Sequence, residues 1–177
     1  MSRIPYIDDA EHPEIADLVA RISAGRRGSL INVYRLLLHS PAIAATWFEH
    51  INAVRKKTNL SGRLREILII YIALMNRTDY VIAQHVPKLA QADGVSLAEC
   101  EALRDWRASD FFSNEERTAL VYAEAMTQSI VVSDEVFAAL RPHFDDRAIV
   151  ELSVLIGTYN MHTRVMQALQ VDPENPK

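Results

Sequence analysis

Glu66 and His85 are the two side chains in this sequence whose types and surroundings best suit acid–base chemistry. Glu66 stands directly before the apolar run from Ile67 to Met75, which is typical of a buried helix. A carboxylate at the edge of such a core needs a partner or a raised pKa. His85 follows in the next expected helix, within an otherwise apolar stripe. By spacing alone, a core histidine bonded to a neighbour is the favoured interpretation, and a proton-transfer site is the alternative.

Pro87 lies two positions after His85 and should disturb the helix that carries it. Proline has no backbone N–H, so we expect a kink here and a free carbonyl at Ala83. A kink at this point would give His85 a pocket wall. His162 could line the same pocket, although a core or interface histidine is the favoured interpretation of its position in the last helix.

The elements that must position these side chains are all expected to be helices. The 5 glycines and 7 prolines fall where helices should stop, and serine and aspartate caps fall where helices should begin. We expect an all-α chain, a compact bundle of roughly eight or nine helices, in which no strand pattern survives. The expected helical segments are 13–24, 30–39, 41–57, 61–75, 79–94, two segments opened by capping boxes at Ser96/Glu99 and Ser113/Glu116, 133–140 and 145–169.

The length of 177 residues fits one domain, which we expect to span 1–177 with residues 1–10 and 170–177 at its periphery. Residues 25–28 read as a short basic turn. The tail DPENPK at 172–177 is polar and is expected to fray.

Composition excludes several classes of function. The net charge of −4 lacks the clustered basic surface of a nucleic-acid-binding protein. No segment suits a membrane span or a signal peptide. Cys100 is the single cysteine, so no intramolecular disulfide can form, and we expect a reducing, cytoplasmic setting. No histidine spacing typical of a metal site and no glycine-rich phosphate loop occurs, so neither a metal nor a cofactor is expected.

Several motifs together indicate a family. The segment from Arg63 to Gly94 has R-E-x-x-I on one helix and A-x-H-x-x-x-x-A, around His85, on the next. It resembles the core of the carboxymuconolactone decarboxylase and alkylhydroperoxidase-D-like family. Three flanking motifs extend the resemblance over most of the chain: L-L-L-H-S-P-A at 36–42, A-L-V-Y-A-E-A at 119–125 and E-L-x-x-L-I-G-x-Y-N-M at 151–161. The resemblance implies an alkylhydroperoxidase-D-like helical fold and a homo-oligomer.

The resemblance also points to what is missing. Alkylhydroperoxidase-like members carry a C-x-x-C motif before the histidine, and that dithiol does the redox work. Thr78 and Val81 stand at the two cysteine positions here, so dithiol peroxidase activity is not expected.

The decarboxylase-like members of the family imply a different reaction. By this resemblance His85 would donate a proton, Glu66 would orient the His85 ring and Tyr80 would donate a hydrogen bond. Asp79, Thr78, Val81 and His162 would bind substrate. The acidic-Tyr-acidic-Trp segment of such members is Asp-Tyr-Val-Ile here, at 79–82, which leaves the substrate open.

We therefore expect a carboxy-lyase-like enzyme that uses cofactor-free acid–base chemistry on a small carboxylated lactone or a related acid from aromatic breakdown. One alternative is a peroxidase-related antioxidant protein that uses Cys100 or chemistry between subunits. The other is a non-catalytic binding or interaction protein that kept the fold.

Overall fold

In the computed structural model, which describes residues 1–26 and 28–174, every regular element is a helix. Taking α5, the π-helical turn that follows it and α6 as one run, the described residues agree with the expected eight or nine helices. The α-helices are α1 (Ala16–Ala24), α2 (Asn32–Leu37), α3 (Pro41–Lys56), α4 (Gly62–Met75), α5 (Asp79–Gln84), α6 (Ala90–Ala92), α7 (Leu97–Ala102), α8 (Asn114–Glu124), α9 (Asp134–Ala138) and α10 (Asp146–Leu169). Two π turns, His85–Leu89 and Ala125–Ser129, and three 3₁₀ turns, Asp9–Glu11, Pro13–Ile15 and Leu103–Ala108, complete the chain.

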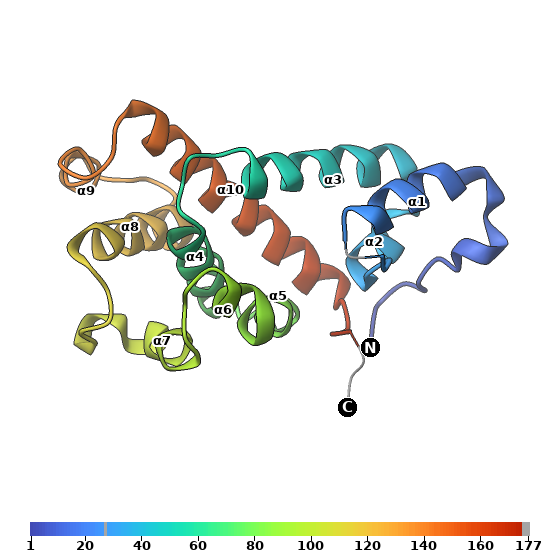
Figure 1. Cartoon of the computed structure of the whole chain (residues 1–177), viewed down its shortest axis with the longest axis horizontal. Coiled ribbons are helices and arrows are strands. Elements are labelled where there is room, and N and C mark those ends of the chain that lie inside the picture. The colour runs from blue at the N-terminus through green and yellow to red at the C-terminus, as the bar shows by residue number, and fades with distance from the viewer. Residues whose placement is uncertain (27, 175–177) are drawn as a thin grey trace.

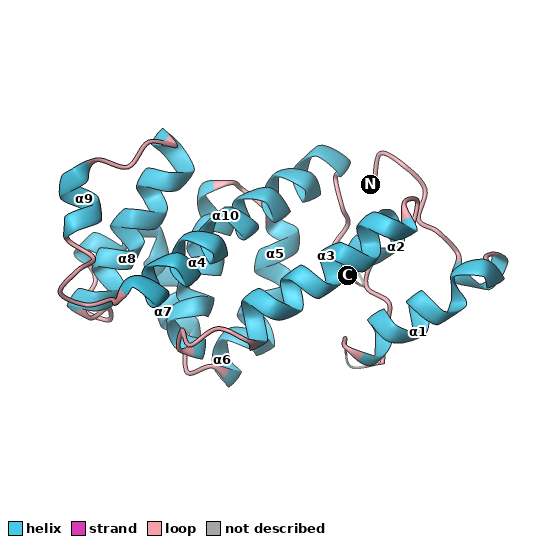
Figure 2. Ribbon diagram, turned by 90° about the horizontal axis from the view of Figure 1, so that it is seen from above, coloured by secondary structure: helices cyan, strands magenta, loops and turns pink. Residues whose placement is uncertain are grey.

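Two helices, α4 and α10, form the centre of the molecule and pack against each other (Figure 1). Helix α3 packs along α10, and α5 and α8 pack against α4. Helices α1 and α2 lie at one end of the elongated molecule, and α7, α8 and α9 lie at the other (Figure 2). The middle of the molecule is thus where elements from both halves of the sequence meet.

Helix α4 is buried around almost its whole circumference. Every residue from Glu66 to Ala73 is buried, as its unbroken apolar sequence predicts for a helix at the centre of a core. No described helix is both long enough and apolar enough to cross a membrane.

The capping residues begin their helices as predicted. Ser61 accepts a hydrogen bond from the Leu64 N–H, and the two expected capping boxes both form. Asp145 caps α10. Two helices differ in length from the prediction: α2 is shorter than the expected 30–39, and α9 is shorter than the expected 133–140. The basic turn expected at 25–28 includes Arg27, which lies outside the described residues.

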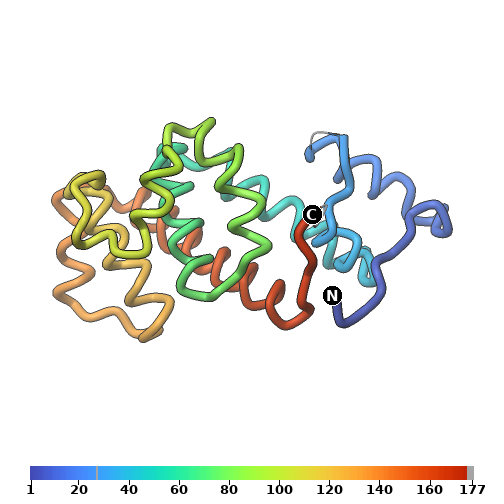
Figure 3. Tube along the Cα trace, turned by 90° about the horizontal axis from the view of Figure 1, so that it is seen from below, coloured from blue at the N-terminus to red at the C-terminus, as the bar shows by residue number. Residues whose placement is uncertain are grey.

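The N-terminal residues and the segment that follows α10 lie side by side (Figure 3). The Ser2 N–H and the Tyr6 hydroxyl both donate to Asp172, and Glu174 accepts from the Asn32 N–H. The expectation of a frayed tail is therefore wrong for Asp172 and Glu174, because these carboxylates find partly buried donors that their polarity alone did not reveal. The rest of the tail, 175–177, lies outside the described residues.

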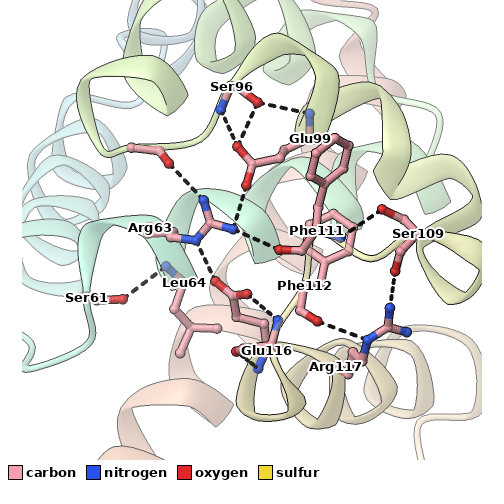
Figure 4. Close-up of polar contacts among 12 residues, drawn as sticks. Ser61, Arg63, Leu64, Ser96, Glu99, Ser109, Phe111, Phe112, Glu116 and Arg117 are labelled. Carbon is pink, nitrogen blue, oxygen red and sulfur yellow. Dashed lines mark hydrogen bonds and ion pairs between the residues drawn. The ribbon is translucent and has the colours of Figure 1, made fainter.

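Arg63 joins three helices near the start of α4 (Figure 4). Its guanidinium contacts Glu99 of α7 and Glu116 of α8, each at 2.7 Å, and donates to the Gly94 carbonyl at 2.8 Å. Both glutamates also complete their capping boxes. This cluster fixes the N-terminal end of α4, on which Glu66 lies one turn later.

Candidate functional site

Helix α4 places the Glu66 carboxylate where no solvent reaches it, with a side-chain exposure of 0%. An isolated buried carboxylate is strongly unfavourable, so it must find donors or a cation. Two neighbours supply them: Arg55 from the end of α3 lies 3.2 Å from Oε1, and His85 Nδ1 lies 2.6 Å from Oε2. The expected partnership of Glu66 and His85 is a direct contact in the fold.

The protonation of this pair follows from its surroundings. Burial favours the neutral acid, but the His85 hydrogen bond and the positive charge of Arg55 outweigh it and lower the pKa of Glu66. Burial lowers the pKa of His85 more than Glu66 raises it. The ground state is therefore a carboxylate beside a neutral imidazole. Because a carboxylate can only accept, His85 Nδ1 carries the hydrogen, and Nε2 keeps its lone pair.

The backbone around His85 departs from α geometry as Pro87 predicts. Residues His85–Leu89 form a π turn between α5 and α6, and His85 is its first residue. Proline cannot donate to the helical ladder, so the wider turn accommodates the missing bond. The expected irregularity thus falls directly at the histidine.

His85 lies on the wall of a cavity of about 550 Å³, a volume suited to a small organic molecule. Helices α3, α5 and α10 contribute to its wall together with the segment between α1 and α2. Exposed Ser29, Lys56 and Lys88 mark its mouth. The lining residues are Gly25, Arg26, Ser29, Ile31, Val33, Tyr34, Ile51, Arg55, Lys56, Arg65, Tyr80, Val81, Gln84, His85, Lys88, Leu89, Tyr159 and His162.

The charge on the described cavity wall has one sign. Five lining residues are arginine or lysine, and the described lining includes no aspartate or glutamate. Arg55 is paired with Glu66, and Arg65 is paired with Asp93 at 2.8 Å. Part of the positive charge is therefore neutralised by carboxylates that do not line the cavity. Arg26, Lys56 and Lys88 have no acidic partner within residues 1–26 and 28–174. Such a wall favours an anionic ligand.

The substrate-binding residues expected from the sequence fall into two places. Val81 and His162 line the cavity together with His85. Thr78 and Asp79 instead line a second hollow, beside Met166 and the chain ends. Thr78 is buried at the start of α5, and Asp79 is exposed. Thr78 and Val81 are one helical turn apart, yet they line different spaces.

Tyr80 borders both spaces, but its hydroxyl is already engaged. It donates to Glu174 at 3.0 Å and accepts from the Val33 N–H at 3.3 Å. Burial and the Glu174 charge raise its pKa well above the ordinary range of a phenol. Glu174 thus accepts the hydrogen bond that, by the sequence-based expectation, Tyr80 would donate to a substrate.

Sequence reasoning missed Tyr159, Arg26 and Arg55 as members of the site. Tyr159 lies three residues before His162 on α10, a spacing that puts both on one face. Its ring packs edge-on against His85, with centroids 5.9 Å apart. The i, i+3 spacing could have found Tyr159, whereas Arg26 and Arg55 are brought in only by the packing of α1 and α3.

Cys100 is separate from this cavity. It is buried in α7 and does not line the cavity. Burial, followed by the Glu99 charge, raises the pKa of its thiol. A reactive thiolate is therefore disfavoured.

Comparison with known proteins agrees with this arrangement. Residues 41–125, which include Glu66 and His85, match the model of the Carboxymuconolactone decarboxylase family. The segment from 41 to 125 belongs to this family. The single cysteine of the chain is consistent with the lack of a C-x-x-C motif.

Two relatives of this chain are uncharacterized bacterial proteins. YnjA of Escherichia coli (strain K12) is 36% identical over 66% of this chain and 64% of its own length. YdfG of Bacillus subtilis (strain 168) is 29% identical over 64% of this chain and 78% of its own length. The match thus spans less than two thirds of the Escherichia coli protein.

Solved structures share the alkylhydroperoxidase-D-like fold. An uncharacterized peroxidase-related protein from Silicibacter sp. TM1040 matches with a TM-score of 0.83 at 22% identity, over 98% of this chain and 91% of its own. The debrominase Bmp8, in a complex with 2,3,4-tribromopyrrole, matches with a TM-score of 0.82 at 18% identity, over 99% of this chain and 95% of its own. At these identities the likeness shows the fold.

Proposed function

We propose that this protein is an acid–base enzyme for a small carboxylated lactone or a related cyclic acid, and that His85 transfers the proton. The observation that carries the proposal is the contact of His85, on the wall of a cationic cavity, with the buried carboxylate of Glu66. The carboxylate orients the ring, and the positive wall attracts the acid.

The reaction can be written for loss of CO₂ next to a carbonyl group. The C–C bond to the carboxylate breaks, CO₂ leaves and an enolate remains, which must then receive a proton on carbon. Resting His85 is neutral, so it must first take a proton from solvent. A bound anion and the Glu66 carboxylate both favour the imidazolium. Delivery of that proton to carbon completes the product and restores neutral His85.

Thiol chemistry has less support. A peroxidase-related or debrominating role would need an accessible thiolate, and Cys100 is buried, does not line the cavity and has a raised thiol pKa. The debrominase complex holds a small planar ring on the same fold. A ring of that size would also fit about 550 Å³, which supports a cyclic substrate.

The proposal includes the setting of the protein. We place it in the cytoplasm, where its single cysteine would stay reduced, acting on a small molecule as an assembly of identical chains.

An assay with carboxylated butenolides as substrates tests the proposed function, with CO₂ release as the measure of turnover. His85→Gln should lower kcat/KM by about 100-fold or more, because it removes the proton-transfer group while filling the same space. His143→Gln, an exposed histidine outside the cavity, is the matched control and should not change it. Circular dichroism should show that both variants fold.

Two outcomes would contradict the proposal. Equal turnover by the wild type and His85→Gln would remove His85 as the proton-transfer group. Specific binding of these acids without any turnover would indicate a non-catalytic binding protein instead.

A further inference from the structure

Four side chains on the cavity wall keep polar atoms that find no hydrogen-bond partner in the described part of the chain. Three of these atoms are buried: Arg26 Nε, Arg65 Nε and His162 Nδ1. The fourth is the hydroxyl of Tyr159, a residue that is 2% exposed and lines the cavity. Buried polar groups are nearly always satisfied in native proteins, so three on one wall indicate a missing polar ligand.

Aromatic side chains hold Arg26 in place, and no carboxylate within residues 1–26 and 28–174 pairs with it. Its guanidinium donates to the Tyr34 hydroxyl at 2.8 Å and lies 5.4 Å from the Tyr34 ring centroid and 5.7 Å from that of Phe48. Gly25 permits this close packing, because a Cβ there would lie 2.4 Å from Phe48 Cζ. The guanidinium is thus preoriented at the cavity with donors to spare.

Tyr159 stands between the two histidines of the cavity. Its ring centroid is 5.9 Å from that of His85 and 5.7 Å from that of His162. Burial raises the pKa of Tyr159 to about 12, against the opposing charges of Arg55 and Arg26. The phenol therefore stays protonated and can donate a hydrogen bond beside the reacting imidazole.

The chemistry of these groups selects a class of ligand. A guanidinium can only donate, and a protonated phenol donates readily, so their common partner must be an oxygen acceptor with negative charge. The rings of Tyr34, Tyr159 and His162 on the same wall favour a flat molecule.

We infer that Arg26 and Tyr159 form a carboxylate-binding subsite next to His85, and that the ligand is a planar cyclic carboxylate. The inference rests on the proposed function only in giving His85 a reaction to perform on the bound acid. The subsite itself is a binding property and is open to measurement without turnover.

Calorimetric titration of the wild-type protein with benzoate at neutral pH tests the subsite, with benzamide as the uncharged probe of the same shape. Benzoate should bind and benzamide should bind at least about tenfold more weakly. Arg26→Met and Tyr159→Phe should each weaken benzoate binding by about tenfold, and Arg26→Lys should recover part of the loss. His85→Gln should still bind benzoate.

Matched controls separate the subsite from general charge and from folding. Lys57→Met removes the same charge from an exposed position outside the cavity. Tyr122→Phe removes a buried hydroxyl that is bonded to Ser153 instead. Both should bind benzoate like the wild type, and thermal melting should show that all variants fold.

Several results would overturn the subsite. These are no saturable binding of benzoate, equal binding of benzamide, or unchanged affinity in folded Arg26→Met and Tyr159→Phe. Tighter binding of phenyl phosphate than of benzoate would assign the donors to a phosphate ester. A failure of the proposed function has a different signature, because His85→Gln would then keep full turnover while benzoate binding still depended on Arg26 and Tyr159.

Discussion

At the scale of single residues, Glu66 and His85 set each other's charge. Glu66 stays ionised in the core because Arg55 and His85 contact its two oxygens. His85 stays neutral because its burial outweighs the attraction of Glu66. The same contact therefore serves stability and function, and a change in Glu66 should disturb both.

Glu66→Ala should lower the free energy of unfolding by about 3–5 kcal/mol, because it leaves the Arg55 cation and the His85 ring without their buried partner. Urea unfolding at neutral pH measures this. Glu115→Ala, at an exposed position of α8, is the control and should change the value by less than about 0.5 kcal/mol. A loss from Glu66→Ala as small as that of the control would show that the pair is not a buried ionic contact.

His162 should make the stability depend on pH. Burial, and then the nearby charges of His85, Arg26 and Arg55, lower its pKa to about 3. The unfolded chain takes up a proton near the ordinary value of about 6.5. The stability contributed by neutral His162 is thus complete above about pH 6.5 and is lost as pH falls toward 3.

Between about pH 7 and pH 5, the wild type should therefore lose about 1–2 kcal/mol more stability than His162→Gln. Chemical unfolding at a series of pH values measures the difference. His143→Gln is exposed and should follow the wild-type curve. Parallel curves for the wild type and His162→Gln would refute a buried neutral His162.

At the scale of elements, α4 depends on ionic contacts at its N-terminal end. Partial burial favours the neutral acid at Glu99, but the hydrogen bonds from Arg63 and Ser96 outweigh it and lower its pKa to about 2 (Figure 4). Because α7 and α8 both meet Arg63, this one side chain sets how they approach α4.

Arg63→Met should destabilise the fold by about 2–4 kcal/mol, because Glu116 is left partly buried without its cation. The depressed pKa of Glu99 adds stability that is complete above about pH 4.5 and is lost as pH falls toward 2. The variant should therefore lose less stability than the wild type in this acid range, as unfolding curves would show. Arg104→Met, whose exposed pair with Glu101 lies on the surface, should have little effect.

At the scale of the whole molecule, α10 leaves an apolar stripe on the surface. Val150, Val154 and Met161 are 62%, 44% and 40% exposed at helical spacing, and exposed Gly157 lies between them with open space around it. A two-fold axis at Gly157 would set Val154 near Met161 of a second copy. The shape of this stripe is thus self-complementary.

We expect the wild-type chain to associate through this stripe, and Val154→Glu should shift it toward the monomer because it buries a charge at the contact. Light scattering coupled to gel filtration measures the molar mass. Val131→Glu, at an exposed residue away from α10, is the control and should keep the wild-type mass. A monomeric wild type would contradict the association, and an unchanged mass in Val154→Glu would place it elsewhere.

The sequence alone determined most of the helices and the reactive pair. Ser61, Ser96, Ser113 and Asp145 act within a few residues, so their caps could be read directly. The apolar run after Glu66 implied burial, and burial required a partner. Pro87 indicated the irregular turn at His85, because a missing N–H is a property of the residue itself.

Only the tertiary structure decided which side chains share the cavity. Arg26, Arg55 and Tyr159 come from three separate segments, and nothing local in the sequence relates the segment after α1 to α3 and α10. Thr78 and Asp79 line one space and Val81 lines another, although the sequence places them together. Caps and kinks follow from neighbouring atoms, whereas a cavity follows from how distant helices pack, and that depends on the whole core at once.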